Sequence, residues 1–165
     1  IDCNIIVNVF GDEALVNPQH IDKVVSALQE DKTLNVAILI NQYSKKNSPS
    51  DIKAVVNENM DVMYLSRADI PSGARTQNPP MYKAYHILPF RKSFLLEYAS
   101  WPKGHLEQIE YHEHLRILEK GYTIRAVEVE SDAVSVDTPE DLQFVKEKMI
   151  NDPFFSEYKY KLRVH

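Results

Sequence analysis

Apolar residues recur along the chain in two patterns, continuous short runs and helical stripes. The run from Cys3 to Phe10 is nearly all apolar and rich in β-branched residues, which predicts a strand covered on both faces. After it, Asn17 and Pro18 are typical of the N-cap and first position of a helix. That helix carries an i, i+3, i+4, i+7 stripe of Ile21, Val24, Val25 and Leu28.

The same reading extends to the end of the chain. It predicts further strands at 34–40, 52–57, 62–65, 85–88 and 123–129, helices at 92–98, 106–119 and 139–149, and loops at 41–51 and 72–80. The second and third of these strands are expected to form a hairpin, and Thr138, Pro139 and Asp141 predict a capping box for the last helix. Strands that alternate with helices predict an α/β fold, and the hairpin makes its sheet mixed.

Composition narrows the function classes. With 44% hydrophobic and 26% charged residues the chain is typical of a globular domain, and its net charge of −5 argues against a nucleic-acid-binding surface. Cys3 is the single cysteine, so an intrachain disulfide and a cysteine-based zinc site are excluded. We therefore expect a reducing, cytoplasmic setting with neither membrane nor nucleic acid as partner.

Two separated aspartates are candidate metal ligands. Asp12 follows Gly11 directly after the first predicted strand, and Asp137 lies between a short apolar run and the last helix. Open α/β sheets bind ligands beyond the carboxyl ends of their strands, and two carboxylates there could share one Mg²⁺. Taken singly, either aspartate is more often a residue of a turn or of a helix start than a metal ligand.

Polar side chains on the predicted helix at 106–119 form a second candidate site. Glu107, Glu110 and His114 share one stripe, which would suit sugar hydroxyls but is also usual for a solvated face. His112 and His114 are two positions apart and would point in opposite directions, which excludes a shared metal on a helix. Arg67 ends a predicted strand and could bind a carboxylate or phosphate, or pair with Asp69 at the surface.

Six segments in a fixed order resemble a known family. They are Asn8–Glu13, Met63–Pro71, Tyr98–Pro102, Leu106–Glu110, Leu115–Tyr122 and Val136–Leu142. Together they resemble the CMP-Kdo synthetase (3-deoxy-manno-octulosonate cytidylyltransferase) family over nearly the whole chain up to Met149. The resemblance implies a three-layer nucleotide-diphospho-sugar transferase-like fold. It also implies a Mg²⁺-dependent reaction of CTP with an acid sugar, serving surface polysaccharide synthesis, and a homodimer.

The resemblance also implies roles for particular residues. Asp12 and Asp137 match the family's metal-binding, catalytic aspartates, and Arg67, Glu107 and Glu110 fall in segments that line its sugar site. His86 and His114 stand in two further sugar-site segments and complete the set of candidate substrate ligands.

Some positions depart from the family's pattern. Phe10 and His114 stand where the family usually has glutamine, and its His-x-Gly-Ile-Tyr strand reads Ala84 to Leu88 here. These differences leave the identity of the acid sugar open. An acylneuraminate-type cytidylyltransferase and a non-catalytic sugar-nucleotide or partner-binding module with the same fold are the alternatives.

We expect residues 1–165 to form one domain that is incomplete at its N-terminus. The sequence begins at Ile1, close to a predicted strand, and the family's Gly-rich nucleotide loop would precede it, so the isolated chain is predicted to be inactive. The aromatic tail at 150–165 is expected to pack on the core or on a partner subunit.

Overall fold

The structure is a computed structural model that describes residues 2–131, 134–155 and 157. It divides the chain into two compact units, which are considered separately. The sheet unit comprises residues 1–10 and 17–131, and the C-terminal unit comprises residues 11–16 and 132–165. The predicted single-domain organisation stays a prediction.

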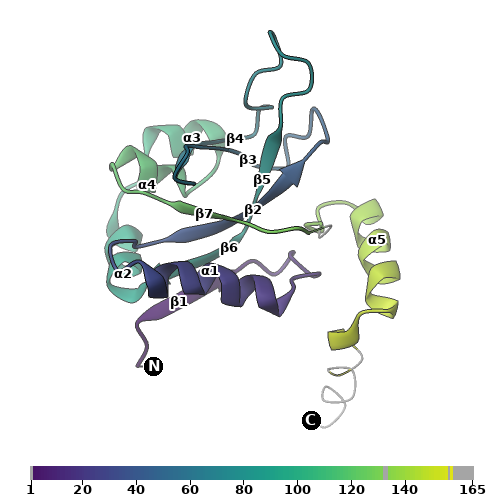
Figure 1. Ribbon diagram of the computed structural model, residues 1–165, viewed down its shortest axis with the longest axis horizontal. Helices are drawn as coiled ribbons and strands as arrows, with labels where there is room; N and C mark the ends of the chain where they lie inside the picture. Colours follow the sequence, from purple (N-terminus) through teal and green to yellow (C-terminus); the bar gives the residue numbers. More distant parts are fainter. Residues whose placement is uncertain (1, 132–133, 156, 158–165) are drawn as a thin grey trace. The chain divides into compact units, whose positions relative to one another are not determined.

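The sheet unit contains seven strands and four helices in its described part (Figure 1). The strands are β1 (Ile5–Val9), β2 (Ala37–Tyr43), β3 (Lys53–Val56), β4 (Val62–Ser66), β5 (Met81–Tyr85), β6 (Ile87–Arg91) and β7 (Arg125–Glu128). The helices are α1 (Pro18–Glu30), α2 (Lys92–Ser100), α3 (His105–Glu110) and α4 (Leu115–Glu119).

Five strands form a mixed sheet in the order β4-β3-β5-β2-β7. Strand β2 lies between β5 and β7 and is antiparallel to β5 and parallel to β7, so the predicted mixed α/β sheet is confirmed. The hairpin of β3 and β4 is also confirmed. In the view of Figure 1, α1 lies below β2 and β7, whereas α3 and α4 lie above them.

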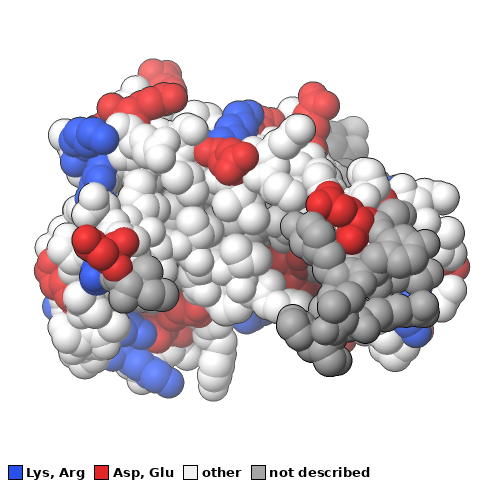
Figure 2. All heavy atoms as spheres, turned by 90° about the horizontal axis from the view of Figure 1, so that it is seen from below, with Lys and Arg blue, Asp and Glu red and all other residues white. Residues whose placement is uncertain are grey.

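The core of this unit is built from residues of the strands, of α2 and α4 and of adjoining segments, and their side chains are almost completely buried. It includes Val36, Ile38, Ile40, Ala54, Leu65, Leu88, Phe90, Phe94, Leu115, Ile117 and Ile124. α1 contributes Val24 and Leu28 from the predicted stripe. On the face shown in Figure 2, the described Lys and Arg side chains are interspersed with Asp and Glu.

Two strand predictions need correction. β1 is only half-buried, with Val9 42% exposed, and it pairs with β6 in a separate two-stranded sheet. The predicted cover on both faces is therefore wrong for the described residues. The sequence reading also placed one strand at 85–88, where the structure has the ends of β5 and β6 with His86 between them.

The predicted helix at 106–119 is wrong as one continuous element. It ends at Glu110 because Tyr111 adopts a left-handed conformation (φ 51°, ψ 47°), and α4 begins at Leu115. The guanidinium of Arg67 accounts for the end, since it donates to the carbonyls of Glu110 (2.8 Å) and Tyr111 (3.2 Å). A helix leaves its last carbonyls without partners, and a cation there is favourable.

The C-terminal unit is organised around one helix, α5 (Pro139–Ile150). Thr138 and Asp141 form the predicted capping box with Pro139 in the first turn. In the aromatic tail, Phe154 and Phe155 are 37% and 42% exposed, and Tyr158 and Tyr160 lie outside the described residues. No described helix is long and apolar enough to cross a membrane.

Candidate functional site

The C-terminal unit brings the two candidate metal ligands onto neighbouring backbone segments. The backbone N–H of Val136 donates to the carbonyl of Asp12 over 3.0 Å, and Asp137 is the next residue. Asp12 is half-buried and Asp137 is exposed. Neither carboxylate makes a hydrogen bond or ion pair with another described residue, so both remain available for a ligand.

Neighbouring side chains fix the two segments. The Ser135 hydroxyl donates to the Glu13 carboxylate (3.0 Å), and both side chains are buried. The Asp141 carboxylate accepts hydrogen bonds from the backbone N–H groups of Asp137 (3.3 Å) and Thr138 (2.9 Å). The loop that carries Asp137 is therefore tied to the start of α5.

The donor set fits Mg²⁺ better than a metal that needs a complete protein cage. The described residues hold no group of three or more His, Cys, Asp or Glu side chains arranged to bind a metal. Mg²⁺ is usually bound by one or two carboxylates, and waters and substrate phosphates complete its octahedron. Asp12 and Asp137 supply that number of free carboxylates.

In the sheet unit, Glu110 and Arg67 are already engaged by the protein. The Glu110 carboxylate accepts from the Ser66 hydroxyl (2.7 Å) and from the backbone N–H of Arg67 (2.9 Å). Burial would raise the pKa of this carboxyl, but these bonds, with the Tyr64 hydroxyl and the charge of Arg67, outweigh burial and lower it. The Arg67 guanidinium also donates to the carbonyl of Pro49 (2.8 Å), so it joins the loop before β3 to the end of α3.

Glu107 is engaged even more completely. Its two carboxylate oxygens accept from Nη2 and Nε of Arg116, both at 2.7 Å, and one also accepts from the backbone N–H of Gly104 (2.9 Å). The pKa of the buried carboxyl is lowered chiefly by the Arg116 hydrogen bonds. The structure thus gives Glu107 a cap and an ion pair, and no ligand role is visible in these contacts.

The three histidines of this region form one cluster of rings. The His112 ring lies edge-on to His86 and His114, with centroids 5.8 Å and 4.9 Å away, and His86 meets Phe10 at 4.9 Å. Burial, followed by the charges of neighbouring groups, lowers the pKa of both His112 and His114, so both are neutral at pH 7. Among the residues that the structure describes, neither His112 Nε2 nor His114 Nδ1 has a hydrogen-bond partner, and both atoms are buried.

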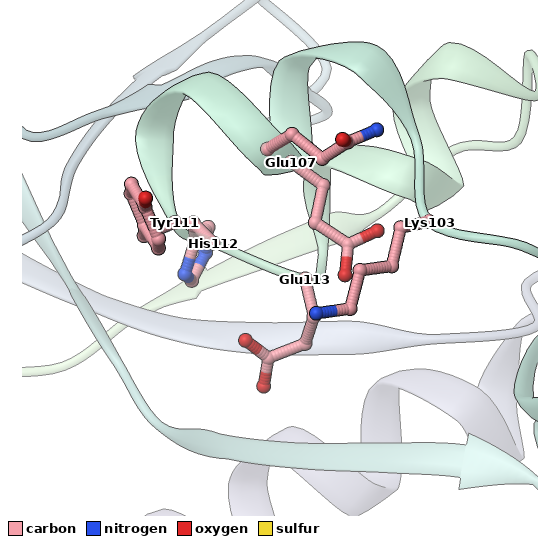
Figure 3. A pocket seen from close by; sticks show the side chains of 6 residues that line it. Lys103, Glu107, Tyr111, His112 and Glu113 are labelled. Carbon is pink, nitrogen blue, oxygen red and sulfur yellow. The ribbon is translucent and has the colours of Figure 1, made fainter.

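A cavity of about 440 Å³ opens between α3 and the segment that follows it (Figure 3). It is lined by Lys103, Glu107, Gln108, Tyr111, His112 and Glu113. Sequence reasoning selected only Glu107 from this set as a candidate ligand. The helix breaks at Tyr111 within this lining, and no local sequence signal marks that break.

Comparison with known proteins identifies the family. The family model described as "Cytidylyltransferase" matches residues 1–129. The chain belongs to the cytidylyltransferase family. A 3-deoxy-manno-octulosonate cytidylyltransferase from Syntrophus aciditrophicus is 37% identical over 90% of this chain and 62% of its own length. An 8-amino-3,8-dideoxy-manno-octulosonate cytidylyltransferase from Shewanella woodyi is 33% identical over 92% of this chain and 63% of its own length.

Solved structures confirm the predicted fold class. CMP:2-keto-3-deoxy-manno-octonic acid synthetase, solved in complex with CTP, superposes with a TM-score of 0.85 at 32% identity. The alignment covers 91% of this chain and 63% of that one. The inositol-1-phosphate CTP transferase from T. maritima, at 17% identity and a TM-score of 0.59, shares the fold. This chain of the cytidylyltransferase family thus spans about three fifths of the length of its first relatives.

Proposed function

We propose that this chain forms the larger part of a cytidylyltransferase that joins the CMP moiety of CTP to an acid sugar and releases pyrophosphate. The observation that carries the proposal is the pairing of Asp12 and Asp137, two free carboxylates on adjacent backbone in a member of this family. The names of its relatives, which include 3-deoxy-manno-octulosonate and its 8-amino counterpart, support an acid sugar as the acceptor.

The reaction exchanges one phosphorus–oxygen bond for another. The anomeric hydroxyl of the sugar attacks the α-phosphorus of CTP, a new oxygen–phosphorus bond forms, and the bond to the bridging oxygen breaks. Pyrophosphate leaves with the electron pair, and the hydroxyl proton is lost to solvent. Asp12 and Asp137 would hold Mg²⁺, which when bound offsets phosphate charge and favours ionisation of the hydroxyl.

The wider setting follows from the same proposal. The product would be a CMP-activated sugar for surface polysaccharide synthesis, made in the cytoplasm where CTP is available. We also propose a homodimer, since Met63, Leu96 and Ile109 are more than 60% exposed on the sheet unit. Light scattering after size-exclusion chromatography would test this assembly.

The deciding experiment measures pyrophosphate release with Mg²⁺, CTP and a panel of acid sugars. The protein should be produced from the whole reading frame that encodes this chain, alongside Asp12→Asn and Asp137→Asn. Loss of a metal ligand should lower turnover at least about a hundredfold, because metal stabilisation of the transition state is worth several kcal/mol. Asp22→Asn, which removes an exposed carboxylate on α1, is the matched control and should retain full turnover.

The outcomes separate the enzyme from its alternatives. Turnover with one sugar class that is lost in both aspartate variants would establish the reaction and its metal ligands. Turnover with sialic-type acids alone would favour an acylneuraminate cytidylyltransferase. A folded protein that turns over no sugar would refute the catalytic proposal and favour a binding module.

A further inference from the structure

The cavity beside α3 has the size of a small-molecule site. Its volume of about 440 Å³ lies within the range of about 300–1,000 Å³ that is usual for ligand pockets. Its lining combines two carboxylates, an ammonium, an amide, a phenol ring and an imidazole. The charges that remain free in this lining decide which ligand would fit.

Glu107 adds no net charge to the cavity. Its carboxylate is matched by the Arg116 guanidinium through two hydrogen bonds of 2.7 Å, and its side chain is buried. His112 is 3% exposed and neutral, so it supplies a polar wall without charge. The ligand therefore meets no unpaired charge at either residue.

Lys103 and Glu113 remain as ions of opposite sign. The exposed Lys103 ammonium makes no hydrogen bond or ion pair within 4 Å in the part of the chain that the structure describes. The Glu113 side chain is 44% exposed, and its carboxylate lies 3.8 Å from Nε2 of His114, which is neutral. Figure 3 shows Lys103 extending along the side of the cavity where Glu113 lies.

We propose that this cavity selects a zwitterionic acid sugar, with Lys103 binding its carboxylate and Glu113 binding its ammonium group. A sugar with a carboxylate alone would satisfy Lys103 and leave Glu113 facing a hydroxyl. Hydrogen bonds between two charged groups are stronger than those in which one partner is neutral. Gln108 and Tyr111, both exposed, line the same cavity and can meet the hydroxyl groups of the ligand.

The buried histidine cluster contributes to this choice by remaining uncharged. A protonated His112 would repel the ammonium and compete for Glu113. Because His112 packs edge-on against His86 and His114 and is excluded from water, the cavity keeps one free charge of each sign. This inference rests on the proposed function for its ligand class and goes beyond it by naming the residues that discriminate.

The test is a binding measurement without CTP, so that it does not depend on turnover. Calorimetric titration of the full 165-residue chain would compare 8-amino-3,8-dideoxy-manno-octulosonate with 3-deoxy-manno-octulosonate, which differ by an ammonium and a hydroxyl group. We expect the amino sugar to bind at least about tenfold more tightly. Glu113→Gln should remove that difference, and Lys103→Met should weaken both sugars by a similar factor.

Glu58→Gln and Lys32→Met are matched controls, since each removes the same charge from an exposed position of the sheet unit. Equal affinity of the two sugars, a preference that survives Glu113→Gln, or no binding of either sugar would overturn the inference. Turnover by the protein from the whole reading frame is decided separately. Turnover there without the predicted preference would leave the proposed function intact and refute the role of this cavity.

Discussion

A substitution of Glu107 would distinguish a structural role of this side chain from a role in substrate binding. It belongs to the candidate sugar site implied by the sequence, yet its carboxylate is bonded to Arg116 and to the backbone N–H of Gly104. We predict that Glu107→Gln mainly lowers the free energy of unfolding. Glutamine keeps the shape of the side chain and one acceptor oxygen, but it has no charge and places an amide NH₂ against the guanidinium.

The magnitude follows from the bonds that are lost. At least one of two charge-assisted bonds to Arg116 disappears, and such bonds contribute about 1.5–3 kcal/mol each. The side chains of the pair are only 9% and 13% exposed, so the unpaired guanidinium cannot recover full hydration. Breaking a buried pair costs about 3–5 kcal/mol, and we expect about 3 kcal/mol here. For a chain of this size the midpoint of thermal unfolding should fall by roughly 6–12 °C.

Urea unfolding followed by circular dichroism would measure the loss. The denaturation midpoint should fall and the m-value should stay constant, because the buried surface is little changed. Glu58→Gln removes an exposed carboxylate and should shift the midpoint by less than about 0.5 kcal/mol in equivalent free energy. Unchanged stability of Glu107→Gln together with weaker sugar binding would refute this reasoning and show that the carboxylate contacts substrate.

Three further predictions concern groups that the sheet unit buries fully or in part. The lowered pKa values of His112 and His114 mean that the unfolded chain binds protons first as pH falls. The free energy of unfolding should therefore decline by about 1.4 kcal/mol per histidine per pH unit below about pH 6.5. Urea midpoints between pH 7.5 and 5 should show this slope, and a variant with both histidines changed to glutamine should flatten it. Lys53→Met leaves the three carbonyls that accept from its fully buried ammonium without a donor, and the free energy of unfolding should fall by about 3 kcal/mol, against no loss in Lys32→Met. Arg67→Lys keeps the charge but cannot span three carbonyls, so a loss of about 1–2 kcal/mol in urea unfolding is expected, whereas undiminished stability would point to a ligand role.

Elements with strong local signals were predictable from the sequence. The side chains of the N-cap residues Asn17 and Thr138 each accept a hydrogen bond from a backbone N–H in the first turn of their helix. Their residue types and the prolines that follow them predict these helix starts. Gly121 follows α4 and has φ +79°, a conformation for which glycine is the usual residue at a helix end. These features depend on residues within one turn of each other, and the sequence contains all of that information.

Features that depend on distant partners were not predictable. Helical periodicity continues through Tyr111, and the break there depends on Arg67, which directly follows β4. The pairing of Glu107 with Arg116 also requires α3 and α4 to fold back on one another. The sequence pattern could not place these partners. It therefore did not distinguish committed carboxylates, which are already bonded to other residues of the chain, from free ones as candidate ligands.

The division between committed and free carboxylates is what gives this acidic chain a candidate site. Lys83 (2.6 Å) and two hydroxyl groups surround Asp51, and although burial opposes it, their hydrogen bonds hold the pKa of its carboxyl at about 2. Carboxylates such as Asp51 are stabilised by other residues of the chain, and their oxygens have few remaining acceptor sites for a ligand. Asp12, Asp137 and Glu113 keep their charge without such compensation, which a protein tolerates at positions where a ligand supplies the missing partner. Neutralising them should therefore cost binding or turnover and leave the free energy of unfolding nearly unchanged.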